Sequence, residues 1–127
     1  RRALHSRGFR YRIHCKDLPG NPDLCLPKYR AVIFVHGCFW HGHDCHLFKW
    51  PKTRPEFWKQ KIDRNRSVDS VALARLAEAG WRVATVWECA LKGKTRLQLG
   101  DVVASLDRWL RSDEPGLKIE GAPECPR

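Results

Sequence analysis

Residues 36–46 gather side chains that bind metals and transfer protons. The stretch reads His-Gly-Cys-Phe-Trp-His-Gly-His-Asp-Cys-His and holds four of the six histidines and two of the six cysteines. A structural zinc ion takes four thiolate or imidazole ligands in a tetrahedron, and Cys38, His43 and Cys45 supply three from this one loop. This density of ligand types favours a metal site over a set of loop histidines beside two unrelated buried thiols.

The fourth ligand must come from another part of the chain. Cys89 follows the apolar segment 81–87 directly. If that segment pairs in parallel with the apolar segment 31–35, their carboxyl ends meet at one edge of a sheet, which places Cys89 better than the three remaining cysteines. Spacing alone leaves three loop histidines open as the imidazole ligand: His41, His43 and His46.

Asp23 is a candidate for a second kind of metal site. It follows the turn 18–22, Leu-Pro-Gly-Asn-Pro, and stands at the head of a short apolar strand. A carboxylate there can hold Mg²⁺, with water and a phosphate completing the octahedron, and a nearby histidine can deprotonate the attacking water. The residues alone slightly favour the simpler role, in which Asp23 caps the turn.

Aromatic and basic residues surround the candidate metal loop. Phe39 and Trp40 lie inside it and can either stack on nucleobases or pack against a sheet. Residues 49–66 contain seven Lys or Arg and two acidic residues, interleaved with further aromatic rings. The whole chain has 24 Lys plus Arg against 14 Asp plus Glu, a net charge of +10. This balance predicts a polyanionic partner, nucleic acid first, over a merely basic solvated surface.

Length and composition exclude several classes of protein. The 127 residues are 43% hydrophobic and 30% charged, which is typical of one globular domain. We expect that domain to span residues 1–112, with a flexible tail over 113–127. No apolar run approaches the roughly 18 residues of a membrane span, and no signal peptide is visible. Cysteines near histidines indicate reduced thiols and a cytoplasmic protein. The absence of Met predicts that the chain is a fragment.

Hydrophobic periodicity predicts the secondary structure around these residues. The expected elements are a helix tail over 1–8, strands over 9–14, 23–26, 31–35 and 81–87, and helices over 54–65, 68–79 and 99–110. Thr53 and Glu56 have the form of a capping box, and Gly80 is expected to end the helix whose buried stripe is Ala72, Leu73, Leu76 and Ala79. This order predicts an α/β domain with a mixed sheet and helices on both faces.

Three motifs together resemble the very short patch repair (Vsr) endonucleases. They are Leu-Pro-Gly-Asn-Pro-Asp at 18–23, Phe-Val-His-Gly-Cys-Phe-Trp-His-Gly-His-Asp-Cys at 34–45, and Gly-Trp-Arg-Val-Ala-Thr-Val-Trp-Glu-Cys-Ala-Leu at 80–91. The resemblance spans roughly residues 1–109. It implies a restriction-endonuclease-like fold and a hydrolase of mismatch repair that nicks one DNA strand 5′ of the mispaired thymine at a T:G mismatch.

The resemblance also implies a role for individual residues. Asp23 and the main-chain carbonyl of Val35 would bind the catalytic Mg²⁺, His41 would act as general base, and His36 would lie near the scissile phosphate. The structural Zn²⁺ ligands would be Cys38, His43, Cys45 and Cys89. The rings that intercalate into DNA would be Phe39, Trp40 and Trp58. The enzyme would be a bacterial, nucleoid-associated monomer whose partners are T:G-mismatched DNA and other mismatch-repair proteins.

Two departures from the family pattern qualify this expectation. Val35 stands where a well-known member has threonine, which has no effect if only the carbonyl binds metal. The chain is also expected to begin partway through the family's first helix, past an acidic residue and a DNA-clasping arm. Two alternatives therefore stay open: a zinc-stapled DNA-binding module without catalysis, and a related nuclease acting on another DNA structure.

Overall fold

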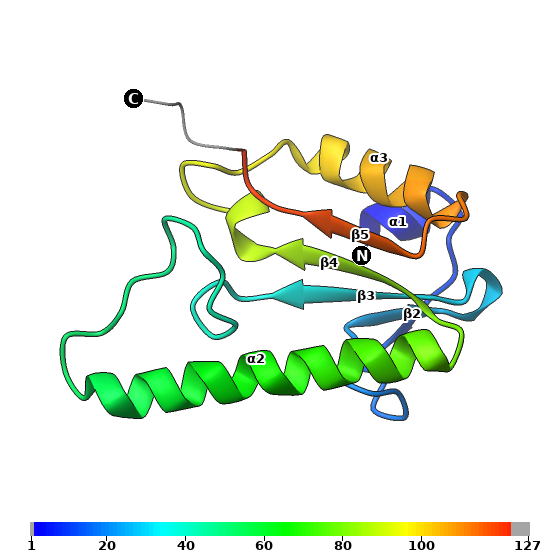
Figure 1. Cartoon of the computed structure of the whole chain (residues 1–127). Coiled ribbons are helices and arrows are strands. Elements are labelled where there is room, and N and C mark those ends of the chain that lie inside the picture. Colours follow the sequence, from blue (N-terminus) through cyan, green and yellow to red (C-terminus); the bar gives the residue numbers. More distant parts are fainter. Residues whose placement is uncertain (1, 123–127) are drawn as a thin grey trace.

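The computed structural model describes residues 2–122, which form a five-stranded mixed sheet flanked by helices (Figure 1). The strands are β1 (Arg12–Ile13), β2 (Leu24–Leu26), β3 (Ala31–His36), β4 (Arg82–Trp87) and β5 (Gly116–Ile119). The helices are α1 (Arg2–Ser6), α2 (Pro55–Glu78) and α3 (Leu99–Leu110), with short 3-10 turns η1 (Pro27–Tyr29) and η2 (Glu88–Ala90). The predicted fold class is confirmed.

The strands lie in the order in which they occur along the chain. β1, β2 and β3 pair antiparallel, whereas β3 with β4 and β4 with β5 pair in parallel. His36 is opposite Trp87 at the carboxyl ends of β3 and β4. The loop after β3 and the turn after β4 therefore start at the same edge of the sheet, as the sequence predicts.

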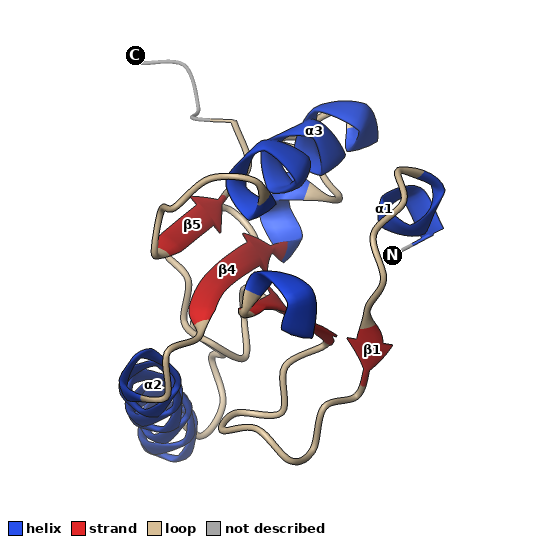
Figure 2. Cartoon of the chain, turned by 90° about the vertical axis from the view of Figure 1, so that its right-hand side faces the viewer, coloured by secondary structure: helices blue, strands red, loops and turns tan. Residues whose placement is uncertain are grey.

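Helices cover both faces of this sheet, with α2 on one side and α1 and α3 on the other (Figure 2). Successive side chains of β3 pack on opposite faces of the sheet. Ile33 belongs to the core under α3, and Phe34 belongs with Leu76 to the core under α2. A strand buried on both faces must be apolar throughout, which is what the run 31–34 shows. Among the described residues, no helix combines the length and apolarity needed to cross a bilayer.

The two helices expected over 54–65 and 68–79 are one continuous helix, α2, so that prediction is wrong. No Gly or Pro interrupts it after Pro55, and its middle is held by side-chain bonds: Asn65 donates to the Trp40 carbonyl at 2.8 Å, and Arg66 donates to the Gly42 carbonyl. These contacts outweigh the weak helix propensity of the residues there. Gly80 follows its end in the left-handed region, as predicted.

The helix begins within one residue of its predicted start at Arg54, but the predicted cap and part of the buried stripe are wrong. The residue before the helix is Arg54, in a left-handed conformation and without a side-chain cap, so the Thr53–Glu56 capping box does not form. Leu73 is 42% exposed and Ala79 is exposed as well, because a helix that covers only one part of the sheet buries a narrow stripe.

Two strand predictions need correction. Only Arg12–Ile13 of the expected strand 9–14 pairs with β2, and Phe9 is instead buried against Tyr29. Residues 116–119, expected to lie in a flexible tail, form β5, because a parallel register with β4 satisfies their backbone groups. Residues 123–127 of the expected tail and Arg1 lie outside the described residues.

Candidate active site and metal centre

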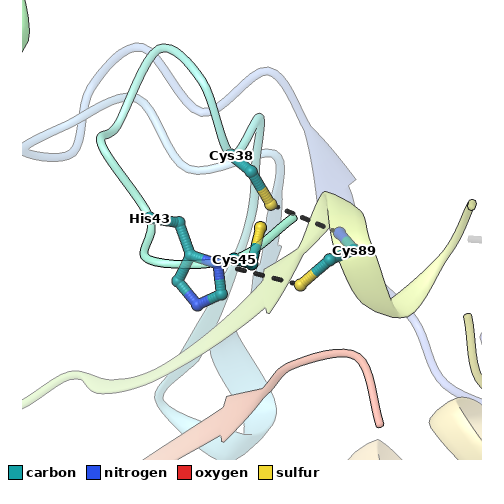
Figure 3. A group of neighbouring side chains, drawn as sticks. All are labelled: Cys38, His43, Cys45 and Cys89. Atoms are coloured by element: carbon teal, nitrogen blue, oxygen red, sulfur yellow. Dashed lines mark hydrogen bonds between the residues drawn. The ribbon is translucent and has the colours of Figure 1, made fainter. Parts of the chain in front are cut away.

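Four metal-binding side chains meet at the carboxyl ends of β3 and β4. Cys38, His43 and Cys45 come from the loop after β3, and Cys89 lies in η2 directly after β4 (Figure 3). One ligand atom from each residue lies within 4.8 Å of all the others. The structure therefore brings Cys89 to the loop, as the sequence predicts.

His43 is the imidazole in this cluster, out of the three histidines that spacing left open. Its Nδ1 lies 3.7 Å from Cys89 Sγ, and its Nε2 lies 2.5 Å from Glu120 Oε1. A carboxylate only accepts hydrogen bonds, so Nε2 donates to Glu120 and Nδ1 stays free to bind a metal. His41 and His46 bond to other partners.

Backbone amides and burial act in opposite directions on the thiols of this cluster. The Cys89 N–H donates to Cys38 Sγ at 3.3 Å, and the Gly121 N–H donates to Cys89 Sγ at 3.2 Å. Burial raises the pKa of Cys38 to about 12 and also raises the pKa of Cys89. A dication would reverse this preference for the protonated thiol, and three sulfurs with one imidazole are a donor set that suits zinc.

A second polar group lies beside the metal cluster, between β3 and α2. The rings of His36 and His41 stack with centroids 3.9 Å apart and planes 6° apart. Asp69 of α2 places its Oδ2 2.5 Å from His41 Nδ1. Because the carboxylate accepts, the neutral form of His41 has its hydrogen on Nδ1 and its lone pair on Nε2. This is the orientation required of a histidine that acts as a general base.

His36 is a neutral imidazole in this arrangement. Burial, aided by the neighbouring His41, lowers the pKa of His36 to about 4, while the carboxylates of Asp69 and Asp23 oppose the shift. The ring is therefore uncharged at pH 7 and can donate or accept a hydrogen bond. Asp23 accepts the N–H of Val35, the residue before His36, and His41 stacks on the His36 ring, so contacts through these two neighbouring residues link the candidate metal-binding carboxylate to the candidate base.

Asp23 turns its carboxylate toward β3 instead of capping its own turn. Its Oδ2 accepts the N–H of Val35 at 2.6 Å, and both residues are exposed. A carboxylate beside an exposed peptide group offers the oxygen donors that Mg²⁺ prefers and leaves room for water and phosphate oxygens. The residues present therefore fit a magnesium ion at this position.

His36, His41 and Asp69 also bring their ligand atoms within 4.8 Å of one another. The His41–Asp69 distance of 2.5 Å is that of a direct hydrogen bond, which leaves no space for an ion between the two groups. The two imidazoles are stacked face to face, so their nitrogens do not converge on one point. We therefore interpret this trio as a proton-transfer group.

An open cleft of about 1090 Å³ gives solvent access to this group. His36, His41 and Asp69 line it at the carboxyl end of β4, and it continues between α2 and β4 as far as Arg82. Trp87 lines the same cleft and stacks on His43 with centroids 4.2 Å apart. Trp87 and His43 therefore connect the metal cluster to the cleft that the proton-transfer group lines.

The three rings expected to intercalate form one cluster beside the loop. Phe39 lies 5.2 Å from Trp40 and 5.4 Å from Trp58, and the two tryptophans lie 5.8 Å apart, centroid to centroid. Trp40 is 48% exposed. The structure therefore brings together rings from the loop and from the first turn of α2, of which Phe39 and Trp58 are partly buried and Trp40 is exposed.

Three carboxylates that organise the site were not predicted from the sequence. Asp69 and Glu120 hold the two imidazoles described above, and Glu88 accepts the N–H of Cys38 at 3.1 Å. Asp69 lies within α2 and Glu120 in the segment expected to be a tail, and neither belongs to a local motif. Only Glu88 carries a signal, since it adjoins the predicted ligand Cys89.

Comparisons with known proteins identify chains that are similar to this one. The family model of DNA mismatch endonuclease Vsr matches residues 1–47. The DNA mismatch endonuclease Vsr of Escherichia coli (strain K12) is 44% identical over 117 residues, covering 92% of this chain and 75% of that protein. The type II nicking enzyme V.XorIIP of Xanthomonas oryzae pv. oryzae is 55% identical over 91 residues, covering 72% of this chain and 67% of the relative. The type II nicking enzyme V.NmeAIP of Neisseria meningitidis is 45% identical over 94 residues, with 74% and 67% covered.

Proposed function

The chain belongs to the Vsr family of DNA mismatch endonucleases, and from this premise we propose that it nicks one strand of duplex DNA 5′ of the thymine in a T:G mismatch. The observation that carries the proposal is the His41–Asp69 pair. The His41 ring stacks on His36, and Val35, the residue before His36, donates its N–H to Asp23. A base and a metal-binding carboxylate held together on a basic surface are the parts needed to hydrolyse a phosphodiester bond.

Each group has a defined task in this hydrolysis. Asp23 and the Val35 carbonyl would hold Mg²⁺, which would supply positive charge to water and to the scissile phosphate. His41 takes a proton from the attacking water at Nε2, and Asp69 fixes the tautomer and stabilises the imidazolium that forms. His36 is neutral and donates a hydrogen bond to the phosphate.

The metal cluster has a structural task. We assign zinc to Cys38, His43, Cys45 and Cys89, and four protein ligands leave no position open for catalysis. Bound by these four residues, the ion would tie the loop that carries His41 to the turn after β4. Loss of zinc would release the base and the neighbouring rings together.

The aromatic cluster reads the mismatch. Phe39, Trp40 and Trp58 enter the duplex between base steps, which costs less at a weakly stacked mismatch than at a matched step. Cleavage of one strand needs only a monomer. We place the enzyme in the bacterial cytoplasm, at the nucleoid, where T:G-mismatched DNA and other mismatch-repair proteins are its partners.

The test is a nicking assay with Mg²⁺ on T:G, matched and other mismatched duplexes. We expect one nick 5′ of the mispaired thymine, lost in Asp23→Ala and His41→Ala. His46→Ala is the matched control, because it removes a histidine of the same loop whose side chain bonds to Thr95 and not to Asp23 or His41. A protein that binds zinc and DNA but nicks no duplex would be a binding module, and equal nicking of every duplex would indicate a different nuclease.

A further inference from the structure

The aromatic surface extends beyond the three rings that we assign to the mismatch. Phe48 stacks on Phe39 with centroids 5.8 Å apart and planes 26° apart. Trp50 then meets Phe48 edge-on, at 4.9 Å and 84°. We call Phe39, Trp40 and Trp58, the rings assigned to the mismatch, the wedge. Phe48 and Trp50 continue the series of rings from the wedge into the segment that joins the metal loop to α2.

Trp50 is the outermost ring of this series. Its side chain is 50% exposed, as much as that of Trp40 at 48%, whereas Phe48 beneath it is partly buried. An indole that only filled the core would be covered, and Phe48 already occupies the inner position. A half-exposed tryptophan supported from below by another ring is the arrangement of a contact surface.

The charge around Trp50 indicates what it contacts. Lys49, Lys52 and Arg54 are all exposed, and no acidic residue occurs between positions 47 and 55. The Arg54 guanidinium lies over the ring of Phe57, 4.4 Å from its centroid, which continues the alternation of rings and cations into α2. Rings interleaved with cations suit the sugar and base faces of DNA beside its phosphates.

We propose that Trp50 packs against a nucleotide flanking the mismatch and supplies affinity that does not depend on the mismatch. The inference rests on the proposed function and adds a contact outside the wedge. Because the ring lies two side chains away from Phe39, it meets the duplex beyond the step that the wedge opens. Its contribution is therefore the same on matched and mismatched DNA.

Binding measurements with Trp50→Ala and Trp50→Phe test this contact. By analogy with ring–base stacking, we expect Trp50→Ala to weaken binding to T:G and to matched duplexes alike, by about fivefold or more, with Trp50→Phe close to wild type. Leu99→Ala is the control, since Leu99 is a 63% exposed apolar residue on α3. Affinities of Trp50→Ala within twofold of wild type on both duplexes would overturn the inference, as would a loss confined to the T:G duplex.

Photocrosslinking separates contact with DNA from a purely structural role. Duplexes carrying 5-iodouracil at single positions on either side of the mismatch are irradiated with the wild-type protein, and the linked residue is identified by mass spectrometry. We expect Trp50 to be linked from a flanking position. Links to other residues but never to Trp50 would overturn the inference while leaving the proposed function intact, whereas failure of the wild type to bind or nick DNA would refute the proposed function itself.

Discussion

Replacing Asp69 by Asn tests the proposed chemistry most directly. The substitution keeps the size of the side chain and removes the charge that faces His41 Nδ1 at 2.5 Å. An asparagine can still accept a hydrogen bond through its carbonyl oxygen, but it can also present its amide, which would favour the wrong tautomer of the imidazole. The imidazolium formed when His41 takes a proton also loses its partner.

The size of the effect follows from the strength and exposure of this bond. A hydrogen bond to a charged group contributes about 1.5–3 kcal/mol, and about 1.4 kcal/mol corresponds to a tenfold change in rate. The side chains of His41 and Asp69 are 24% and 26% exposed, so solvent weakens the interaction and the lower part of that range applies. We expect Asp69→Asn to slow nicking about 10- to 50-fold.

The assay is single-turnover nicking of a T:G duplex at saturating enzyme, so that binding does not limit the rate. Asp63→Asn is the matched control, because it removes the same charge from the same helix. Asp63 pairs with Lys59 at 2.8 Å and is 51% exposed. If both variants nick within twofold of wild type, the His41–Asp69 bond plays no part in catalysis, and the assignment of His41 as base loses its structural support.

Three further variants address zinc, mismatch reading and stability. Cys89→Ser should lower the zinc content and destabilise the domain by several kcal/mol, measured by metal analysis and urea unfolding; full zinc occupancy in the variant would contradict the ligand assignment. Trp40→Ala should reduce the ratio of T:G to matched binding more than it reduces affinity for matched DNA, and equal losses on both duplexes would contradict the wedge. Asp107→Asn should cost about 1 kcal/mol or less at pH 7, because Asp107 of α3 bonds Arg111 at 2.6 Å and Arg7, the residue after α1, at 2.9 Å. These arginines, Arg111 first, lower the pKa of Asp107 in the folded protein, so the stabilisation is present above the unfolded pKa of about 3.9 and is lost as the pH falls through the folded value. The difference in unfolding free energy between wild type and variant should therefore shrink below about pH 4, and a constant difference would exclude the ion pairs as its source.

The predictions that held depend on strong local patterns. The apolar runs of β3 and β4 leave few alternatives to a parallel pair, and that pair alone brings Cys89 to the metal loop. The loop itself carries its ligands within a few positions of one another. Spacing could not decide which loop histidine joins the three cysteines. The choice of His43 depends on its bond to Glu120, which lies 77 residues further along the chain.

The predictions that failed depend on tertiary contacts. The middle of α2 looks like a break because Asn65 and Ser67 are weak helix formers, yet Asn65 is fixed by a carbonyl of the metal loop. β5 has too few apolar residues to be recognised, and it forms because β4 offers an unpaired edge. Asp69 acquires its role only when α2 is laid beside His41. None of these partners is visible within a local window of sequence.

Because α2 is one unbroken helix, it fixes the distance between two parts of the site, the aromatic cluster and the His41–Asp69 pair. Trp58 and Asp69 both belong to this helix, and a spacing of 11 residues is about three turns, so the ring and the carboxylate face the same side roughly 16 Å apart. An extra residue inserted between them would swing one about 100° around the axis relative to the other. Under the proposed function, the pitch of this helix sets the position of the cut relative to the mismatch, and a hinge at the centre of the helix would let that position vary.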